Sequence, residues 1–457
     1  MPKTKDIFVE DSKIAFDKKH RKTINFNISR YDAAVSKGKL RYTNLELAKQ
    51  RASYLKEKVA ANLGRYLEEF EKNALKNNIS VIWARNGEEA VSEIIKVLKK
   101  ENARLLVKSK SMISEEIELN ENLEKSGIEP VETDLGEFIV QVAGEKPYHI
   151  LTPAMHKSKE DVAELFHKKF DTPEDSTPTE LTLFVRKVLR KKFTSAQVGV
   201  TGANFLIADK GGVALTENEG NGIMSVAFPK IHIVISGIEK LIPSINDLPL
   251  FLQLLSAHGT GQQVTVYNSL FTGPKKDNES NGPEKMIVVL LDNNRTEIAK
   301  EKEHFKALKC IRCGACLNTC PIYKNVGGYT YGVTYTGPIG SVITPFMNGF
   351  KNYNHLSYAC SVCGACSEVC PVKIPLHDLL LLNRKKSVEN NYGTLAWNAG
   401  MKAYEWAFKK RKNVDLVNGK IKNKILKTNK NVLGNQKEFP EVAQKSFSKT
   451  WKSNLNL

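Results

Sequence analysis

The sequence predicts an α/β domain with a largely parallel sheet, followed by a smaller cysteine-rich domain and a basic C-terminal region. Three observations lead to this division. Helical and extended patterns alternate between residues 79 and 192, as is typical of an α/β domain. All eight cysteines lie between Cys310 and Cys370. At roughly 150 residues per domain, the 457 residues suffice for two to four domains.

Hydrophobic spacing predicts the elements of the α/β domain. Thr43 and Asn44 offer a cap for one long helix that runs to about Phe70. The alternation that follows has strands at 79–84, 104–108, 129–132 and 149–151, and helices at 88–99, 114–125, 161–169 and 179–192. The second half is richer in strands, which are predicted at 198–201, 204–208, 212–216, 231–236, 263–267 and 286–291. A polar loop covers 272–283, and a helix over 296–308 leads to the first cysteine.

The patterns divide the chain into four parts. These are a polar N-terminal segment (1–43), the α/β domain (44–295), the cysteine-rich domain (296–383) and the basic C-terminal region (384–457). The N-terminal segment lacks the apolar core of a signal peptide, and no stretch approaches the roughly 20 apolar residues that span a bilayer. We therefore expect a cytoplasmic protein in a reducing compartment.

The cysteines form two runs of identical spacing, each closed by proline. The runs are Cys310-x2-Cys313-x2-Cys316-x3-Cys320-Pro321 and Cys360-x2-Cys363-x2-Cys366-x3-Cys370-Pro371. This spacing is the bacterial ferredoxin signature, so we expect two [4Fe–4S] clusters that pass electrons one at a time. In two-cluster proteins the last cysteine of each run ligates the other cluster. The expected ligand sets are Cys310, Cys313, Cys316 and Cys370 for one cluster, and Cys320, Cys360, Cys363 and Cys366 for the other.

Zinc and disulfides are the competing explanations of the cysteines. A zinc site takes four ligands, commonly two Cys-x2-Cys pairs. It would not explain why a third cysteine follows at the same spacing, or why each run ends in Cys-Pro. A disulfide framework does not suit a long chain without a secretory signal. The spacing therefore favours iron–sulfur clusters.

The net charge of +18 is concentrated near the end of the chain. From Leu381 onward there are 17 Lys/Arg against 5 Asp/Glu. This basic region is either a solvated helical face or a surface for an acidic partner, and among partners an acidic redox protein is preferred. No nucleic-acid module is present, so we expect no nucleic-acid partner. Peripheral contact with an acidic membrane surface stays open.

Two further segments stand out. Residues 201–221 place glycines at the ends of short strands before an exposed acidic turn, which suits either the rim of a polar pocket or a plain hairpin. Residues 327–340 carry three tyrosines, Tyr329, Tyr331 and Tyr335, among glycines, which suits either a loop packed over a cofactor or a turn without a chemical role.

Few single residues suggest catalysis. Glu217 and Glu219 are candidate acid/base groups if the pocket is catalytic. His258 is read as an ordinary histidine at a helix end, and His355 and His377 as surface or supporting residues beside the second cysteine run. No residue is assigned a catalytic role.

The 201–221 segment resembles the signature of the lactate-utilisation (LUD) domain family, whose fold resembles that of sugar-phosphate isomerases and coenzyme A transferases. Together with the tyrosine segment and Cys370-Pro-Val-Lys-Ile-Pro-Leu-His377, it makes the chain similar to the lactate utilisation protein B family from about residue 45 to the end. All eight cysteines match that family's pattern. The resemblance implies a LUD domain, then a helical dicluster ferredoxin domain and a similar basic C-terminal region.

The resemblance also implies a function. The chain is expected to be the iron–sulfur subunit of a system that oxidises L-lactate to pyruvate, acting with a cysteine-rich redox subunit and a second LUD-domain subunit. The chemistry agrees, because lactate gives up electrons as a pair and a flavin or nicotinamide normally mediates their transfer to one-electron clusters. Neither Gly-x-Gly-x-x-Gly nor a P-loop motif is present, which favours an electron conduit over a self-contained dehydrogenase.

Two alternatives remain from the sequence. One is an electron-transfer subunit of another complex, of the glycolate-oxidase or heterodisulfide-reductase type, which would need no LUD domain. The other is a ligand-binding or acyl-transferring protein whose clusters are structural staples or sensors.

Overall fold

The structure is a computed structural model that describes residues 4–393, 395–428 and 440–454. Residues 429–439, which belong to the predicted basic C-terminal region, lie outside the described residues. The chain divides into two compact units, Met1–Lys385 and Lys386–Leu457, which are described separately. The first unit contains the α/β domain and both cysteine runs.

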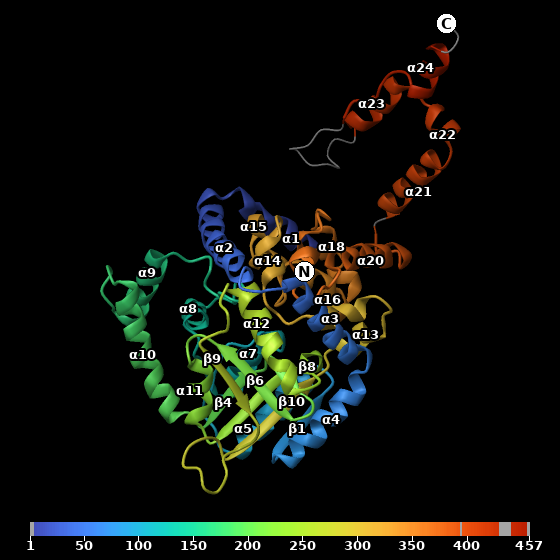
Figure 1. Ribbon diagram of the computed structural model, residues 1–457. Coiled ribbons are helices and arrows are strands. Elements are labelled where there is room, and N and C mark those ends of the chain that lie inside the picture. Colours follow the sequence, from blue (N-terminus) through green and yellow to red (C-terminus); the bar gives the residue numbers. More distant parts are fainter. Residues whose placement is uncertain (1–3, 394, 429–439, 455–457) are drawn as a thin grey trace. The chain divides into compact units, whose positions relative to one another are not determined.

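A six-stranded parallel sheet forms the centre of the α/β domain (Figure 1). Its strands, in spatial order, are β1 (Ile79–Ala84), β10 (Lys285–Leu291), β7 (Ile231–Gly237), β4 (Val198–Gly202), β2 (Leu105–Lys108) and β3 (Glu129–Glu132). Both faces of the sheet are covered, so successive side chains such as Ile233 and Val234 are both fully buried. The predicted parallel α/β fold is confirmed.

A second, smaller sheet packs beside the first. It contains β8 (Leu241–Ile242), β5 (Phe205–Ile207), β6 (Gly212–Glu217) and β9 (Tyr267–Phe271) in that order. The strand predicted at 263–267 is therefore wrong by about one strand length, because pairing with β6 starts only at Tyr267 opposite Glu217. The short strand predicted at 149–151 is also wrong. There the backbone N–H groups of Leu151 and Thr152 donate to Nδ1 of His149 at 3.1 and 3.3 Å instead of to a neighbouring strand.

Helices cover the main sheet on both faces. One face carries α5 (Gly87–Lys100), α6 (Met112–Glu116) and α7 (Leu119–Lys125), and the other carries α4 (Leu63–Lys76) and the small sheet. The edge formed by β2 and β3 is covered by α8 (Leu135–Ala143), α9 (Lys159–Phe170) and α10 (Pro178–Ser195). Within the α/β domain, three of the described helices were not predicted from the sequence: α8, α11 (Asn221–Ala227) and α12 (Leu248–Gly259).

Three predicted helices are each split in two. The long N-terminal helix is α3 (Leu45–Ala61) followed by α4, because Asn62 leaves helical geometry at φ −130° and ψ 38°. Glu118, at φ 51°, separates α6 from α7. The helix predicted over 296–308 is α13 (Arg295–Lys300) and a 3-10 helix (His304–Lys309), with Glu301 extended between them.

The cysteine-rich part is helical and shares a hydrophobic core with the N-terminal segment. Its helices are α14 (Ala315–Thr319), α15 (Tyr323–Val326), α16 (Gly337–Asn348), α17 (Phe350–Tyr353), α18 (His355–Tyr358), α19 (Ala365–Val369) and α20 (Leu376–Glu389). The polar N-terminal segment forms α1 (Thr4–Asp11), a 3-10 helix (Ser12–Phe16) and α2 (Lys18–Lys39). Ile24 and Ile28 of α2 are buried in the same core as Leu317 and Val342.

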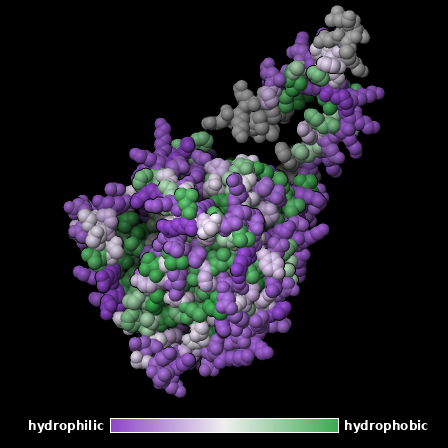
Figure 2. Space-filling view, in the orientation of Figure 1, coloured by the Kyte–Doolittle hydropathy of each residue, from purple (hydrophilic) through white to green (hydrophobic). Residues whose placement is uncertain are grey.

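The second unit is also helical. It contains α21 (Leu395–Lys409), α22 (Arg411–Asp415), α23 (Gly419–Thr428) and α24 (Phe447–Asn454). Within the described parts of the chain, no helix has the length and apolar character needed to cross a bilayer. Figure 2 shows one face of the molecule, where hydrophilic side chains predominate and apolar ones form smaller patches.

Candidate functional site

The two cysteine runs fold in the same way. In each run the second residue after the first cysteine, Arg312 or Val362, adopts a left-handed backbone with φ 60° or 57°. This turn directs its N–H to the preceding sulfur, at 3.4 Å from Sγ of Cys310 and 3.3 Å from Sγ of Cys360. A left-handed glycine, Gly314 or Gly364, then begins the short helix that carries the third cysteine.

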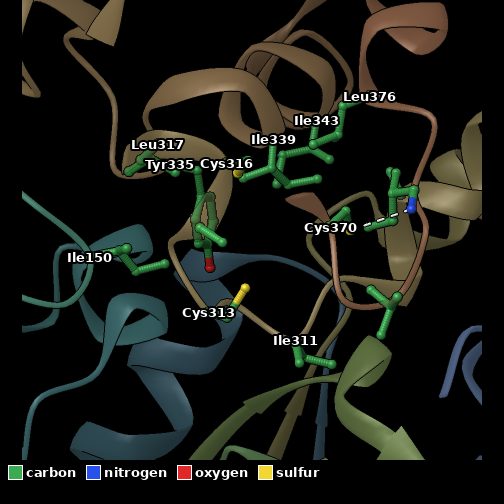
Figure 3. Close-up of a cluster of buried hydrophobic side chains, with 14 of the residues drawn as sticks. Ile150, Ile311, Cys313, Cys316, Leu317, Tyr335, Ile339, Ile343, Cys370 and Leu376 are labelled. Carbon is green, nitrogen blue, oxygen red and sulfur yellow. Dashed lines mark hydrogen bonds between the residues drawn. The ribbon is translucent and has the colours of Figure 1, made fainter. Parts of the chain in front are cut away.

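Cys310, Cys313, Cys316 and Cys370, here called the first thiol group, line one small cavity. Figure 3 shows three of them around a common space with Tyr335 and Ile339. Cys313, Cys316 and Cys370 are buried, and the Ile374 N–H donates to Sγ of Cys370 at 3.4 Å. Burial, and then the charges of the other three sulfurs, raise the pKa of the Cys316 thiol well above its ordinary value. The last cysteine of the second run therefore lies with the first three of the first run.

Cys320, Cys360, Cys363 and Cys366 form the second thiol group. Burial, and then the charges of Cys320 and Cys360, raise the pKa of the Cys366 thiol to about 12. This group is closer to solvent than the first, because Cys363 is exposed. The two groups thus differ in exposure, which is one of the factors that set a cluster potential.

The residues present fit [4Fe–4S] clusters. Each group offers four sulfur ligands, as such a cluster requires, together with backbone N–H groups directed at sulfur. All eight cysteines belong to the described residues, and all are free thiols rather than disulfides. Without iron, the raised pKa values keep these thiols protonated. Bound iron favours their deprotonation to thiolates.

A larger cavity of about 280 Å³ adjoins the first thiol group. It lies at the carboxyl ends of β2, β4 and β7, where open parallel sheets commonly bind ligands. Ile150 and Arg312 line both this cavity and the small cavity of the first thiol group. The carboxyl end of α12 also approaches closely, since a Cβ on Gly259 would lie 3.3 Å from the Cys313 carbonyl oxygen. The α/β domain and the cysteine region therefore meet at this cavity.

A buried charge network forms the inner end of the cavity. Glu239 accepts from Arg295 Nε at 2.6 Å and from Arg312 Nη2 at 3.2 Å. Arg295 also forms a two-pronged pair with Glu116, at 2.8 and 2.7 Å. Although burial raises it, the charges of Arg295 and Arg312 hold the pKa of Glu239 well below its ordinary value. The network fixes the Arg312 side chain between the two domains.

The two candidate acid/base residues line the opposite end. Glu217 is half-buried and accepts from the N–H groups of Gly222 and Ile223 at 2.7 and 2.9 Å, so it caps the start of α11. Glu219 accepts from the Leu135 N–H at 3.0 Å. Partial desolvation, and then the charge of Asp134, raise the pKa of Glu219 to about 7. The structure therefore brings both residues to the cavity, and Glu217 has a structural role there.

The three histidines lie outside this cavity. His258 is buried in α12, and its Nδ1 donates to the Leu254 carbonyl at 2.9 Å. His355 is bound through Nδ1 to the Asn352 carbonyl, and His377 through Nδ1 to Ser367 Oγ.

The tyrosine segment divides between the thiol groups. Tyr335 is buried beside the first group, and its hydroxyl donates to Glu116 at 2.6 Å. Tyr331 is buried where the charges of Cys320 and Cys360 contribute to its raised pKa, so it lies near the second group. Tyr329 is exposed and donates to the Lys146 carbonyl instead.

Several cavity residues were not identified from the sequence. Arg312, Lys240, Glu239, Ser109 and Ser111 carry no motif of their own. The one available signal was the place of Arg312 between two cysteines of a cluster run.

Comparison with known proteins assigns both domains. Residues 67–291 match the LUD domain, and residues 306–374 match the 4Fe-4S dicluster domain. Lactate utilization protein B of Bacillus subtilis is 42% identical over 385 residues, covering 82% of this chain and 80% of that protein. Its counterpart in Bacillus licheniformis is 44% identical over 361 residues, covering 77% and 76%. The uncharacterized electron transport protein YkgF of Escherichia coli is 40% identical over 359 residues, covering 79% and 75%.

The resemblance noted in the sequence is thereby confirmed. Both matched domains follow in the order that the α/β fold and the cysteine region show, and the similarity extends over most of both chains. The chain belongs to the lactate utilization protein B family, and in it a LUD domain is joined to an iron–sulfur dicluster domain.

Proposed function

We propose that this chain is the iron–sulfur electron-transfer subunit of a multi-protein system that oxidises L-lactate to pyruvate. The dicluster domain supports an electron-transfer role, and the names of the relatives support the link to lactate. The single observation that carries the proposal is the gathering of eight thiols into two groups of four, one of them beside a cavity of the LUD domain.

The proposal includes two [4Fe–4S] clusters. One would be held by Cys310, Cys313, Cys316 and Cys370, and the other by Cys320, Cys360, Cys363 and Cys366. When bound, such clusters accept and release single electrons. The protein's own contribution is to hold the thiolates, to donate backbone N–H groups to sulfur and to exclude water from the first group.

The difference in exposure suggests a direction for electron flow. The first group adjoins the cavity of the LUD domain, whereas the second includes the exposed Cys363, where a partner can approach. The proposed partners are a cysteine-rich redox subunit and a second LUD-domain subunit, in the cytoplasm. The basic C-terminal region, residues 384–457, is the proposed contact for an acidic partner. The proposed boundaries of the rest of the chain are 1–43 for the N-terminal segment, 44–295 for the LUD domain and 296–383 for the dicluster domain.

Anaerobic purification tests the proposal. The chain should carry about eight iron atoms, and the complete assembly should reduce an artificial acceptor when L-lactate is added. The isolated chain should hold reducible clusters and show no lactate oxidation. Lactate oxidation by the isolated chain would contradict the subunit role, and zinc in place of iron would contradict the clusters.

Two other functions make different predictions. An electron-transfer subunit of another 2-hydroxy-acid or heterodisulfide-reductase-like complex would transfer electrons but would not respond to lactate in the assembly. A ligand-binding or acyl-transferring protein with structural clusters would hold iron that no accessible potential reduces. Potentiometric EPR distinguishes these two functions, because only the electron-transfer subunit has clusters that can be reduced.

A further inference from the structure

Unpaired hydrogen-bonding atoms converge on the cavity at the carboxyl end of the main sheet. Nε and Nη1 of Arg312 are buried and have no hydrogen-bond partner among the described residues. The same holds for the hydroxyl groups of Ser109 and Ser111, which follow β2 and are 3% and 6% exposed. All three side chains line this one cavity. Buried polar groups without partners cost stability, so a ligand that satisfies them together is expected.

Cationic donors at the inner end suit an anionic ligand. Arg295, Arg312 and Lys240 provide three cationic groups there, near the carboxylates of Glu239 and Glu116 and the sulfur of Cys310. Glu239 is shared between both arginines, and only Nη2 of Arg312 reaches it. The two unpaired Arg312 nitrogens lie on different edges of the guanidinium, so each can give an anion one charge-assisted hydrogen bond.

Arg312 is held in place before any ligand arrives. Its side chain is only 11% exposed, its Cζ lies 4.2 Å from the centroid of the Tyr335 ring, and Glu239 holds Nη2. Because the guanidinium is already ordered, little side-chain entropy remains to be lost on binding. An arginine fixed in this way resembles a positioned anchor more than a mobile surface charge.

The rest of the cavity limits the size and charge of the ligand. Its volume of about 280 Å³ is near the lower end of ligand pockets, so it suits a molecule of few atoms. Ile150, Leu151 and Leu255 supply apolar walls for a short alkyl group. Asp134 and Glu219 at the opposite end would repel a second negative charge.

We propose that this cavity binds a small 2-hydroxy or 2-oxo monocarboxylate, with its carboxylate accepting from an unpaired nitrogen of Arg312 and its C2 oxygen near the hydroxyl groups of Ser109 and Ser111. The choice of acid rests on the proposed function, and lactate and pyruvate are its simplest members. The site would place the acid within this chain, next to the first thiol group, rather than wholly within a partner subunit.

Calorimetric titration of the iron-replete chain under anaerobic conditions tests this site. L-Lactate or pyruvate should bind, the uncharged L-lactamide should not, and L-malate should bind at least about 10-fold more weakly than lactate. R312M should weaken monocarboxylate binding by about 10- to 100-fold. R384M is the matched control, because Arg384 lies over Tyr358 beside the second thiol group but not in the cavity, and it should bind as the wild type does.

Arg312 also lies beside Cys310, so R312M could act through cluster loss rather than through the ligand. Two variants avoid that ambiguity. S111A removes one hydroxyl, and G202A would place a methyl carbon 2.8 Å from Ser111 Oγ. Both should weaken binding with unchanged iron content and unchanged cluster EPR spectra.

Two results would overturn the site. One is an iron-replete wild-type chain that binds neither lactate nor pyruvate, and the other is S111A and G202A proteins that bind them as the wild type does. Failure of the proposed function is distinguishable. An assembly that does not oxidise lactate, together with intact carboxylate binding by this chain, contradicts the function and leaves the site standing.

Discussion

Arg312 lies over the ring of Tyr335, with Cζ 4.2 Å from the ring centroid. The Tyr335 hydroxyl in turn donates to Glu116 at the end of α6. These contacts connect Arg312, inside the first cysteine run, and Tyr335, between the two runs, to the α/β domain. The cavity and the first thiol group are consequently parts of one packed region rather than of two loosely joined domains.

The buried carboxylate of Glu239 is expected to be essential to that region. E239Q would leave the charges of Arg295 and Arg312 only partly compensated, and breaking a buried pair typically costs about 3–5 kcal/mol. Because the pKa of Glu239 is lowered in the folded state, its contribution is present above its ordinary value near 4.5 and is lost as pH falls toward the folded value. Denaturant unfolding at pH 7 measures the cost.

Glu284 offers the matched control for that substitution. It pairs with Lys230 and Lys275 at 3.9 and 3.8 Å, and its side chain is 47% exposed. E284Q should therefore change the free energy of unfolding by no more than about 1 kcal/mol. Equal effects of E239Q and E284Q would show that the buried network does not stabilise the fold.

Lys108, at the end of β2, is a second buried charge with a large predicted effect. Its side chain is fully buried, and Nζ lies 2.6 Å from Glu132 and 3.0 Å from Glu115. Although burial lowers it, these carboxylates hold the pKa of Lys108 above its ordinary value. K108M leaves the carboxylates unpaired and should destabilise the chain by about 3–5 kcal/mol.

Two comparisons sharpen the Lys108 experiment. K96M removes an exposed partner of Glu93 and should cost no more than about 1 kcal/mol. Adding E132Q to K108M removes one of the unpaired charges and should recover part of the loss. A K108M protein as stable as K96M would contradict the expected role of this ion pair.

The buried side chain of His232 should make the free energy of unfolding depend on pH. It is fully buried in β7, where Nε2 lies 2.8 Å from Thr201 Oγ1, and burial lowers its pKa to about 3. The unfolded chain takes up a proton near the ordinary value of 6.5, and the folded chain does not. Stability is therefore lost as pH falls from 6.5 toward 3, by about 1.4 kcal/mol at pH 5.5.

Unfolding at pH 7.5 and 5.5 measures that loss. In H232L, the contribution of His232 to the difference in the free energy of unfolding between the two pH values should be lost. This holds even if the substitution lowers the free energy of unfolding at both pH values. H167Q serves as the control, because the His167 side chain is 42% exposed. An unchanged pH difference in H232L would mean that His232 is protonated in the folded state.

Local patterns account for what was predictable in this fold. Short extended patterns located β1, β3 and β10 to within a residue of their ends, and the cysteine spacing located the thiols. The strand order was not predictable, because β1 pairs with β10 from about 200 residues away. The helix α12 was missed because most of its residues are buried, which removes the one-sided apolar pattern of a surface helix.

Only some of the residues that line the cavity could be predicted from the sequence. Glu217 and Glu219 stood in a segment with recognisable glycines and acids. Arg312 was hidden, because its importance depends on Glu239, on Tyr335 and on atoms left without partners, and such relationships exist only after the chain has folded.

The crossed ligand sets make the sharpest prediction about the thiol groups. If Cys370 serves the same cluster as Cys313, the double variant C313A/C370A damages one cluster and should keep about four iron atoms per chain. C313A/C320A removes the same number of thiols, both from the first run. It should damage both clusters and retain almost no iron, because Cys320 lies with the second thiol group.

Iron content and the EPR spectra of the reduced proteins decide between the pairings. If each run instead supplied all four ligands of its own cluster, the outcomes would be reversed. C313A/C320A would then keep one cluster and C313A/C370A would lose both. Because the two variants carry equal numbers of substitutions and share C313A, a general loss of folding would lower iron in both, and only the ligand pairing produces opposite results.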